Sequence, residues 1–497
     1  MRIVPKLHPC FRLSSVLAAL LLACPGGLSA APPRAPTAHP AAAAAAPFAY
    51  AEAEVADLQA RMLAGELTSR TLTRAYLERI AALDRAGPRL RAVIELNPDA
   101  LKEAAQRDQE RRSGRLRGPL HGIPVLLKDN INAAPMSTTA GSLALAGFRP
   151  DDAFLVRRLR EAGAVILGKA NLSEWANYRG EDSTSGWSAR GGQTRNPYRP
   201  GYSPCGSSSG SGGAVAATLT AASTGTEPDG STVCPAAVNG VVGLKPTVGL
   251  VSRDGIIPIS FSQDTPGPIT RTVADAAAVL TAIAGRDDAD PATATMPGRA
   301  VYDYTARLNL DGLRGARIGV LDSPLTQRPG IDTLMQHALD ELRRAGATVV
   351  RVPALDERQW ADAEQTMLRF EFKAGLERYL RRWKAPLRTL SQVIAFNTEH
   401  AAQELPLFGQ ELLEASVQAG TLGDAGYIQA RTQARRMAGE QGIDALLRAH
   451  QLGALVAPTT GTAWPITRSG GDAFPGGRYR RPPVARFPPP SLPLGPV

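Results

Sequence analysis

An α/β fold, with a central sheet covered by helices on both faces, is predicted by the alternation of short β-rich runs with helical segments. Apolar residues recur at helical spacing in 154–163 and 332–346, between runs rich in aliphatic residues. Strands and helices that alternate in this way build sheets covered by helices. The chain of 497 residues is 43% hydrophobic and 21% charged, which argues against disorder and against multiple membrane spans. The β-rich runs are 121–130, 164–171, 316–322, 347–352 and 453–459.

Residues 1–30 are predicted to be a signal peptide that sends the protein to the periplasm or out of the cell. Basic residues precede the apolar run 13–24, and small residues follow at 29–31, as in a secretory signal. The apolar run is too short to cross a bilayer as a stable helix, so no stable span is expected in the mature chain. Two alternatives stay open: an uncleaved membrane anchor, and a lipoprotein anchored at Cys24.

The Pro- and Ala-rich residues 31–47 are predicted to be a spacer before a folded domain that spans 48–474. Helical periodicity with capping residues indicates helices in 51–67 and 70–84. Residues 355–450 are mostly helical in pattern, and we interpret them as a cap over one end of the sheet.

The net charge of +10 lies mainly at the two ends of the chain. Three basic residues without an acid lie in 1–30 and four lie in 476–497, which leaves only three of the ten excess charges for the body. No basic stripe interleaved with aromatic residues is visible, so nucleic acid is not an expected partner. The oligomeric state is left open.

Two cysteines, Cys205 and Cys234, remain once the signal peptide is set aside. Their spacing fits no metal or redox motif, so we interpret both as small buried residues packed under the loops. A disulfide in an oxidising compartment is the alternative.

The chemistry of the chain turns on which base can activate a serine hydroxyl. None of the six histidines lies in a nucleophile elbow or at metal-ligand spacing, and His121 is interpreted as a structural residue or hydrogen-bond partner. Ligand spacing for a metal is absent, so neither a metal nor a cofactor is expected. Lys128 follows the apolar run VLL, where burial at the edge of a sheet would lower its pKa and make a neutral amine available.

Residues 204–249 form a Ser- and Gly-rich stretch that is predicted to fold as a loop, a small-residue helix, a strand and a second loop. The segments LHGIPVLLKDN, CGSSSGSGG and GTEPDGSTVCPAAVNGVVGLKPTVGLVS occur in this order. Together they resemble the amidase signature family of serine hydrolases, over residues 48 to 474. The segment 252–277 is most similar to the bacterial peptide amidases, which remove the C-terminal amide of peptides. The resemblance implies a mixed, mainly parallel central sheet with helices on both faces.

The resemblance also implies roles for individual residues. Lys128 matches the family's lysine, Ser207 its bridging serine and Ser231 its nucleophile. Neutral Lys128 would accept a proton from Ser207, Ser207 one from Ser231, and Ser231 would attack the amide carbonyl. Backbone N–H groups of Asp229, Gly230 and Ser231 would form the oxyanion hole.

Two further features follow from the match to this family. The peptide bond between Gly206 and Ser207 is expected to be cis. Pro228 has no N–H, so one donor to the oxyanion would be lost.

The chain departs from the family after 474, where a strand and a final helix are expected. Residues 475–497 instead hold many prolines and four arginines, a composition that disfavours both elements and predicts a disordered tail. A shifted reading frame and a natural tail are the two explanations.

The predicted function is that of an exported amidohydrolase acting on amidated peptides or small amides. The alternatives are an amidase or esterase for non-peptide substrates and a catalytically dead peptide-binding relative. A cytoplasmic amidase that supplies ammonia for tRNA amidation is disfavoured by the export signal.

Overall fold

The computed structural model describes residues 48–296, 302–323, 328, 330–467, 470–477 and 484–495. By its internal contacts the chain divides into residues 1–49 and 50–497, and the description below concerns the second unit. The predicted signal peptide, the spacer and part of the tail lie outside the described residues. No helix in the described part is both long and apolar enough to cross a membrane.

The core of the second unit is a sheet with strand order β1-β3-β2-β6-β8-β7-β12. Its strands are β1 (Val93–Leu96), β2 (Pro124–Lys128), β3 (Val165–Ala170), β6 (Ala222–Glu227), β7 (Val242–Leu244), β8 (Thr265–Thr270) and β12 (Pro490–Ser491). β3, β2 and β6 are parallel neighbours, whereas β1, β8 and β12 pair antiparallel with the strands beside them. Strands β2, β3, β6 and β7 therefore run in one direction and the other three run against them, which confirms the predicted mixed sheet.

Two smaller sheets complete the strands of the described part. One has the order β10-β9-β11 and is fully parallel, and the other is the antiparallel pair β4-β5. Their bounds are β9 (Arg317–Leu321), β10 (Thr348–Val352), β11 (Ala454–Val456), β4 (Trp187–Ser188) and β5 (Gly192–Gln193).

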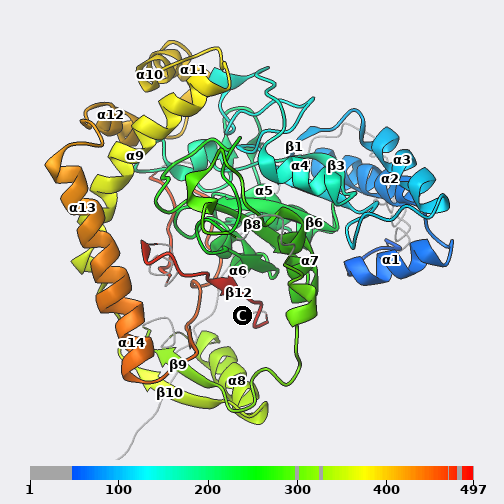
Figure 1. Cartoon of the computed structure of the whole chain (residues 1–497). Helices are drawn as coiled ribbons and strands as arrows, with labels where there is room; N and C mark the ends of the chain where they lie inside the picture. Colours follow the sequence, from blue (N-terminus) through cyan, green and yellow to red (C-terminus); the bar gives the residue numbers. More distant parts are fainter. Residues whose placement is uncertain are drawn as a thin grey trace, which may run out of the picture. The chain divides into compact units, whose positions relative to one another are not determined.

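Helices pack around the sheets, and the α/β class is confirmed (Figure 1). The first eight are α1 (Val55–Leu63), α2 (Ser69–Arg79), α3 (Ala100–Arg112), α4 (Phe154–Glu161), α5 (Ser209–Ala216), α6 (Val233–Val238), α7 (Val273–Ile283) and α8 (Ile331–Arg344). Helix α2 begins where the Thr68 hydroxyl accepts the backbone N–H of Thr71, a cap that satisfies one free donor of the first turn. Helix α5, which belongs to the Ser- and Gly-rich motif stretch 204–249, packs on β6, and α7 packs on β8. Both helices therefore cover the central sheet.

The segment predicted as a helical cap is helical. It contains α9 (Ala361–Arg382), α10 (Leu390–Glu399), α11 (Ala401–Glu404), α12 (Glu411–Val417), α13 (Ala425–Arg435) and α14 (Asp444–Ala449). Helices α9 and α13 pack side by side (Figure 1).

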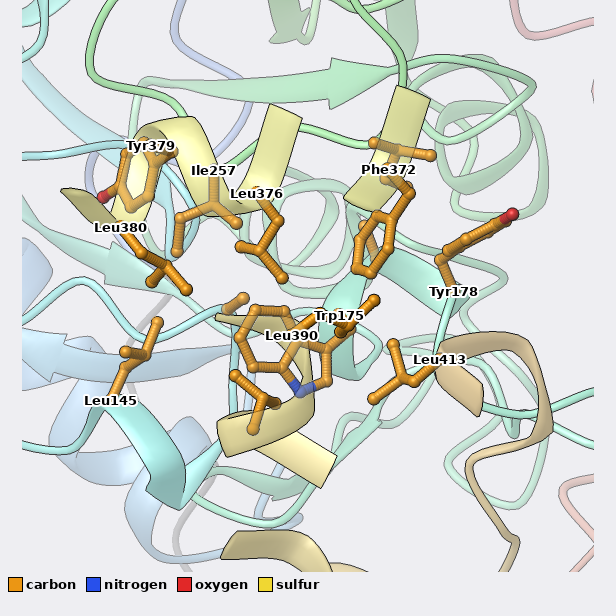
Figure 2. Close-up of a cluster of buried hydrophobic side chains, with 14 of the residues drawn as sticks. Leu145, Trp175, Tyr178, Ile257, Phe372, Leu376, Tyr379, Leu380, Leu390 and Leu413 are labelled. Carbon is orange, nitrogen blue, oxygen red and sulfur yellow. The ribbon is translucent and has the colours of Figure 1, made fainter. Parts of the chain in front are cut away.

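A hydrophobic cluster joins this helical segment to loops of the main domain, as Figure 2 shows. Phe372, Leu376 and Leu380 of α9 are almost completely buried against Trp175 and Tyr178, which precede the motif stretch. Each fully buried side chain of this kind contributes about 1.5–3 kcal/mol. The loop around Trp175 is therefore held in place by buried hydrophobic packing.

The predicted tail needs one correction. Pro490–Ser491 forms the short strand β12, which pairs antiparallel with β7 at the edge of the central sheet. An edge position tolerates proline because its missing N–H costs no hydrogen bond on the open side. The proline content of the tail therefore does not prevent a short edge strand.

Candidate active site

Lys128 and Ser207 lie in direct contact. Lys128 is the last residue of β2, and Ser207 lies two residues before α5, which starts beside the neighbouring strand β6. The Lys128 Nζ atom lies 2.7 Å from Ser207 Oγ and donates to the carbonyl oxygen of Thr226 at 3.1 Å. Both side chains are completely buried. The peptide bond between Gly206 and Ser207 is cis, as expected.

The surroundings of Lys128 favour its neutral amine, which is the form that can act as a base. Complete burial lowers the pKa of Lys128 to about 7, against the opposing effect of the Glu227 and Asp264 carboxylates. A lysine with this pKa is largely neutral just above pH 7. Neutral lysine keeps an N–H for Thr226 and offers a lone pair to the hydroxyl of Ser207.

Ser231 lies in the turn between β6 and α6. Its carbonyl oxygen accepts the backbone N–H of Ser208 at 3.0 Å, which ties this turn to the residue after Ser207. Ser231 is 5% exposed, whereas Ser207 is fully buried. A substrate can therefore reach the hydroxyl of Ser231 more readily than that of Ser207. The hydrogen bond between the two hydroxyls that the relay requires stays a prediction.

The buried carboxylate of Glu227 organises the turn that carries Ser231. Its Oε1 accepts the N–H of Gly230 at 2.9 Å, and its Oε2 accepts those of Thr232 at 2.7 Å and Val233 at 3.1 Å. The N–H of Gly230 thus already has a protein acceptor, which argues against its predicted role as an oxyanion donor. Asp229 and Ser231 remain the predicted donors of the oxyanion hole.

Two further buried groups surround Glu227 and Lys128. Lys245 donates to the carbonyl oxygen of Gln263 at 2.9 Å, and burial lowers its pKa to about 8 against the pull of Glu227. Burial raises the pKa of Asp264 to about 6, although it accepts two backbone N–H groups. The sequence reasoning missed these groups. The signals that could have found Glu227 and Lys245 were a glutamate in the Gly-rich segment GTEPDGS and a lysine in the apolar segment VVGLKP. A charged residue in such a segment is buried only with a partner.

Comparison with known proteins identifies the family. A family model described as Amidase matches residues 71–473. The chain belongs to the amidase family. A probable amidase of Arabidopsis thaliana is 42% identical over 419 residues, which is 82% of this chain and 79% of the relative. The described structure is also similar to that of native peptide amidase from Stenotrophomonas maltophilia, at 71% identity and a TM-score of 0.88 over 91% of this chain and 92% of the other. An amidase-family protein from Bacillus anthracis is 36% identical, with a TM-score of 0.82 over 89% of this chain and 84% of that one.

His121 lies against helix α3 in this amidase. Its Nε2 atom lies 2.9 Å from the carbonyl oxygen of Arg107 in α3, and its Nδ1 atom lies 3.9 Å from Glu110. Burial lowers the pKa of His121. The interpretation of His121 as a hydrogen-bond partner is confirmed.

The favoured interpretation of the two cysteines is wrong. Cys205 and Cys234 form a disulfide, with the sulfur atoms 2.02 Å and the Cα atoms 6.0 Å apart. Both residues are buried, beside Trp464. The bond joins the loop before Ser207 to α6, which follows Ser231, so the two serine-bearing loops of this amidase are covalently linked. Two cysteines in a chain with a predicted secretory signal were the clue that could have favoured the pair.

Proposed function

We propose that this amidase is an exported enzyme that hydrolyses the C-terminal amide of peptides through a Lys128–Ser207–Ser231 relay. The observation that carries the relay is the 2.7 Å contact between Lys128 Nζ and Ser207 Oγ, at a lysine whose pKa is lowered to about 7. The peptide substrate is supported by the 71% identity to the peptide amidase of Stenotrophomonas maltophilia.

In the proposed reaction, neutral Lys128 accepts the proton of Ser207 while Ser207 accepts that of Ser231. The Ser231 oxygen attacks the carbonyl carbon of the amide and forms a tetrahedral intermediate. Backbone N–H groups of the turn, from Asp229 and Ser231, stabilise its oxyanion. The relay then returns a proton to the nitrogen, ammonia leaves, and water hydrolyses the acyl-enzyme at Ser231.

A fluorophosphonate probe tests the nucleophile. We expect the folded wild-type protein to be labelled at Ser231 and to release ammonia from peptide amides, because only an activated serine reacts with such a probe. Ser231→Ala should abolish labelling, whereas Ser262→Ala, a change in a serine outside the proposed relay, should retain it. Peptide mapping by mass spectrometry locates the label.

The same preparation separates the competing functions. A folded wild-type protein without a label would point to the catalytically dead peptide-binding relative. A labelled protein that hydrolyses benzamide-type amides but no peptide amide would keep the relay and overturn the proposed substrate.

Export is supported by the composition of residues 1–30 and by the Cys205–Cys234 disulfide, a bond typical of oxidising compartments. N-terminal sequencing of the protein from a bacterial host with intact secretion tests this proposal. We expect the mature chain to start near Ala31 and to appear in the periplasm or medium. A lipidated N-terminus at Cys24, or an uncleaved Met1, would contradict simple cleavage.

A further inference from the structure

A short turn with an unusual backbone lies against the cis peptide bond. Trp175, Ala176 and Asn177, within the 3₁₀ segment η3 (Glu174–Asn177), have φ values of 47°, 57° and 65°. Three successive left-handed residues without a glycine are rare, because a side chain disfavours this backbone conformation, and they persist only where the surroundings hold them.

The neighbours of this turn hold it on two sides. Trp175 is 1% exposed, its backbone N–H donates to the carbonyl oxygen of Ala140 at 2.9 Å, and its ring lies in the hydrophobic cluster of Figure 2. Tyr178 is buried in the same cluster, with its ring centroid 4.8 Å from that of Phe372. The backbone of Asn177 is therefore fixed by anchored aromatic residues close before and directly after it.

The side chain of Asn177 lies against the residue that precedes Ser207. A Cβ atom added at Gly206 would clash with Asn177 Oδ1 and with Ser173 Oγ, so both oxygens pack against the bare Cα of Gly206. The backbone N–H of Ser173 also donates to the carbonyl oxygen of Ser207 at 3.0 Å. The turn and the Gly206–Ser207 bond thus form one packed unit.

The carboxamide of Asn177 is not used by the protein itself. Asn177 is partly exposed, unlike the buried residues on either side of it. Within the described ranges, no hydrogen bond ties its side chain to another residue. An amide group on a fixed backbone, beside a serine of the proposed relay and with its own hydrogen-bonding capacity unspent, is suited to contact a substrate.

We propose that Asn177 is a specificity-determining residue that recognises the –NH₂ group of the scissile carboxamide. This inference rests on the proposed function, in which Ser207 returns a proton to the leaving nitrogen, so that nitrogen must lie near Ser207. Asn177 Oδ1, in contact with the residue next to Ser207, accepts an N–H of that group. An ester has no N–H at the equivalent atom, and Asn177 therefore favours amides over esters.

The variant Asn177→Gly tests this assignment, because glycine accepts the left-handed backbone without strain and removes only the carboxamide. The measured quantity is the ratio of kcat/KM for a peptide amide to kcat/KM for the methyl ester of the same peptide. We expect the ratio to fall about tenfold, the effect of one lost hydrogen bond in the transition state. Asn177→Asp keeps an acceptor oxygen and should retain most of the preference, and Asn309→Gly, at an exposed asparagine, should leave the ratio unchanged.

The outcomes separate this inference from the proposed function. An Asn177→Gly variant whose two kcat/KM values fall by the same factor, or do not fall, would show a structural role only and overturn the assignment while the amidase activity stands. A wild-type protein that hydrolyses neither substrate would overturn the proposed function, and this assignment with it.

Discussion

Lys128→Met is expected to lower kcat/KM for a peptide amide by about a thousandfold or more, because the relay then has no base. The variant should stay folded. Methionine has a similar length, and it removes an amine that burial alone disfavours in its charged form. Steady-state kinetics together with thermal unfolding of the purified variant measure both effects.

Lys102→Met is the matched control, because Lys102 lies on the exposed side of α3. It should retain wild-type activity.

The wild-type pH profile provides a second check on the base. Because the base must be neutral and the pKa of Lys128 is about 7, kcat/KM should fall as the pH drops below about 7. A Lys128→Met variant with a substantial part of the wild-type kcat/KM would contradict the proposed base.

Glu227→Gln is expected to weaken both the stability and the activity of the enzyme. The neutral amide offers one acceptor oxygen to the three N–H donors of Gly230, Thr232 and Val233, and it leaves Lys245 without its carboxylate neighbour. Unsatisfied buried donors and the loss of one of the carboxylates that balance the charge of Lys245 together should lower the free energy of unfolding by about 3 kcal/mol. Denaturant unfolding followed by circular dichroism measures this loss.

The pH profile of the same variant reports on the electrostatic role of Glu227. Its carboxylate raises the pKa of Lys128, so its removal should let that pKa fall and move the acidic limb of kcat/KM to lower pH. Glu161→Gln, at an exposed residue of α4, should change neither quantity. An unchanged stability and pH profile in Glu227→Gln would show that the carboxylate neither organises the turn nor acts on Lys128.

The strands with aliphatic runs were predictable from the sequence, and one central strand was not. The runs at β2, β3, β9, β10 and β11 stand out because they are rich in aliphatic residues, and β2 and β3 are buried at every position, as strands covered on both faces are. Strand β8 has the sequence TPGPIT, in which prolines argue against a central position. Its neighbour β7 pairs only with Ile269 and Thr270, so Pro266 and Pro268 need no donor on that side. Only the arrangement of the strands in the folded sheet shows that a central strand can hold these prolines.

The site residues that lie in sequence motifs were predictable. Lys128, Ser207 and Ser231 lie in three recognisable segments, and the structure places Lys128 against Ser207. Asn177 carries no signal of that kind, and a glutamate in the Gly-rich segment GTEPDGS indicates only that Glu227 is buried with partners. Both roles depend on which backbone N–H groups or side chains lie beside these residues after folding. The Cys205–Cys234 pair likewise needed the Cα separation, since spacing along the chain does not determine it.

Protein made in the cytoplasm of an expression host would first carry free thiols at Cys205 and Cys234, since glutathione keeps such groups reduced there. Batches of the same mature chain, residues 31–497, from cytoplasmic and from secreting hosts would then differ in specific activity and shelf life. Once closed, the bond is shielded from added reductant, because Cys205 is 4% exposed and Cys234 is fully buried. The choice of host therefore decides which form of the enzyme reaches the assay, and counting thiols under denaturing conditions tells the two forms apart.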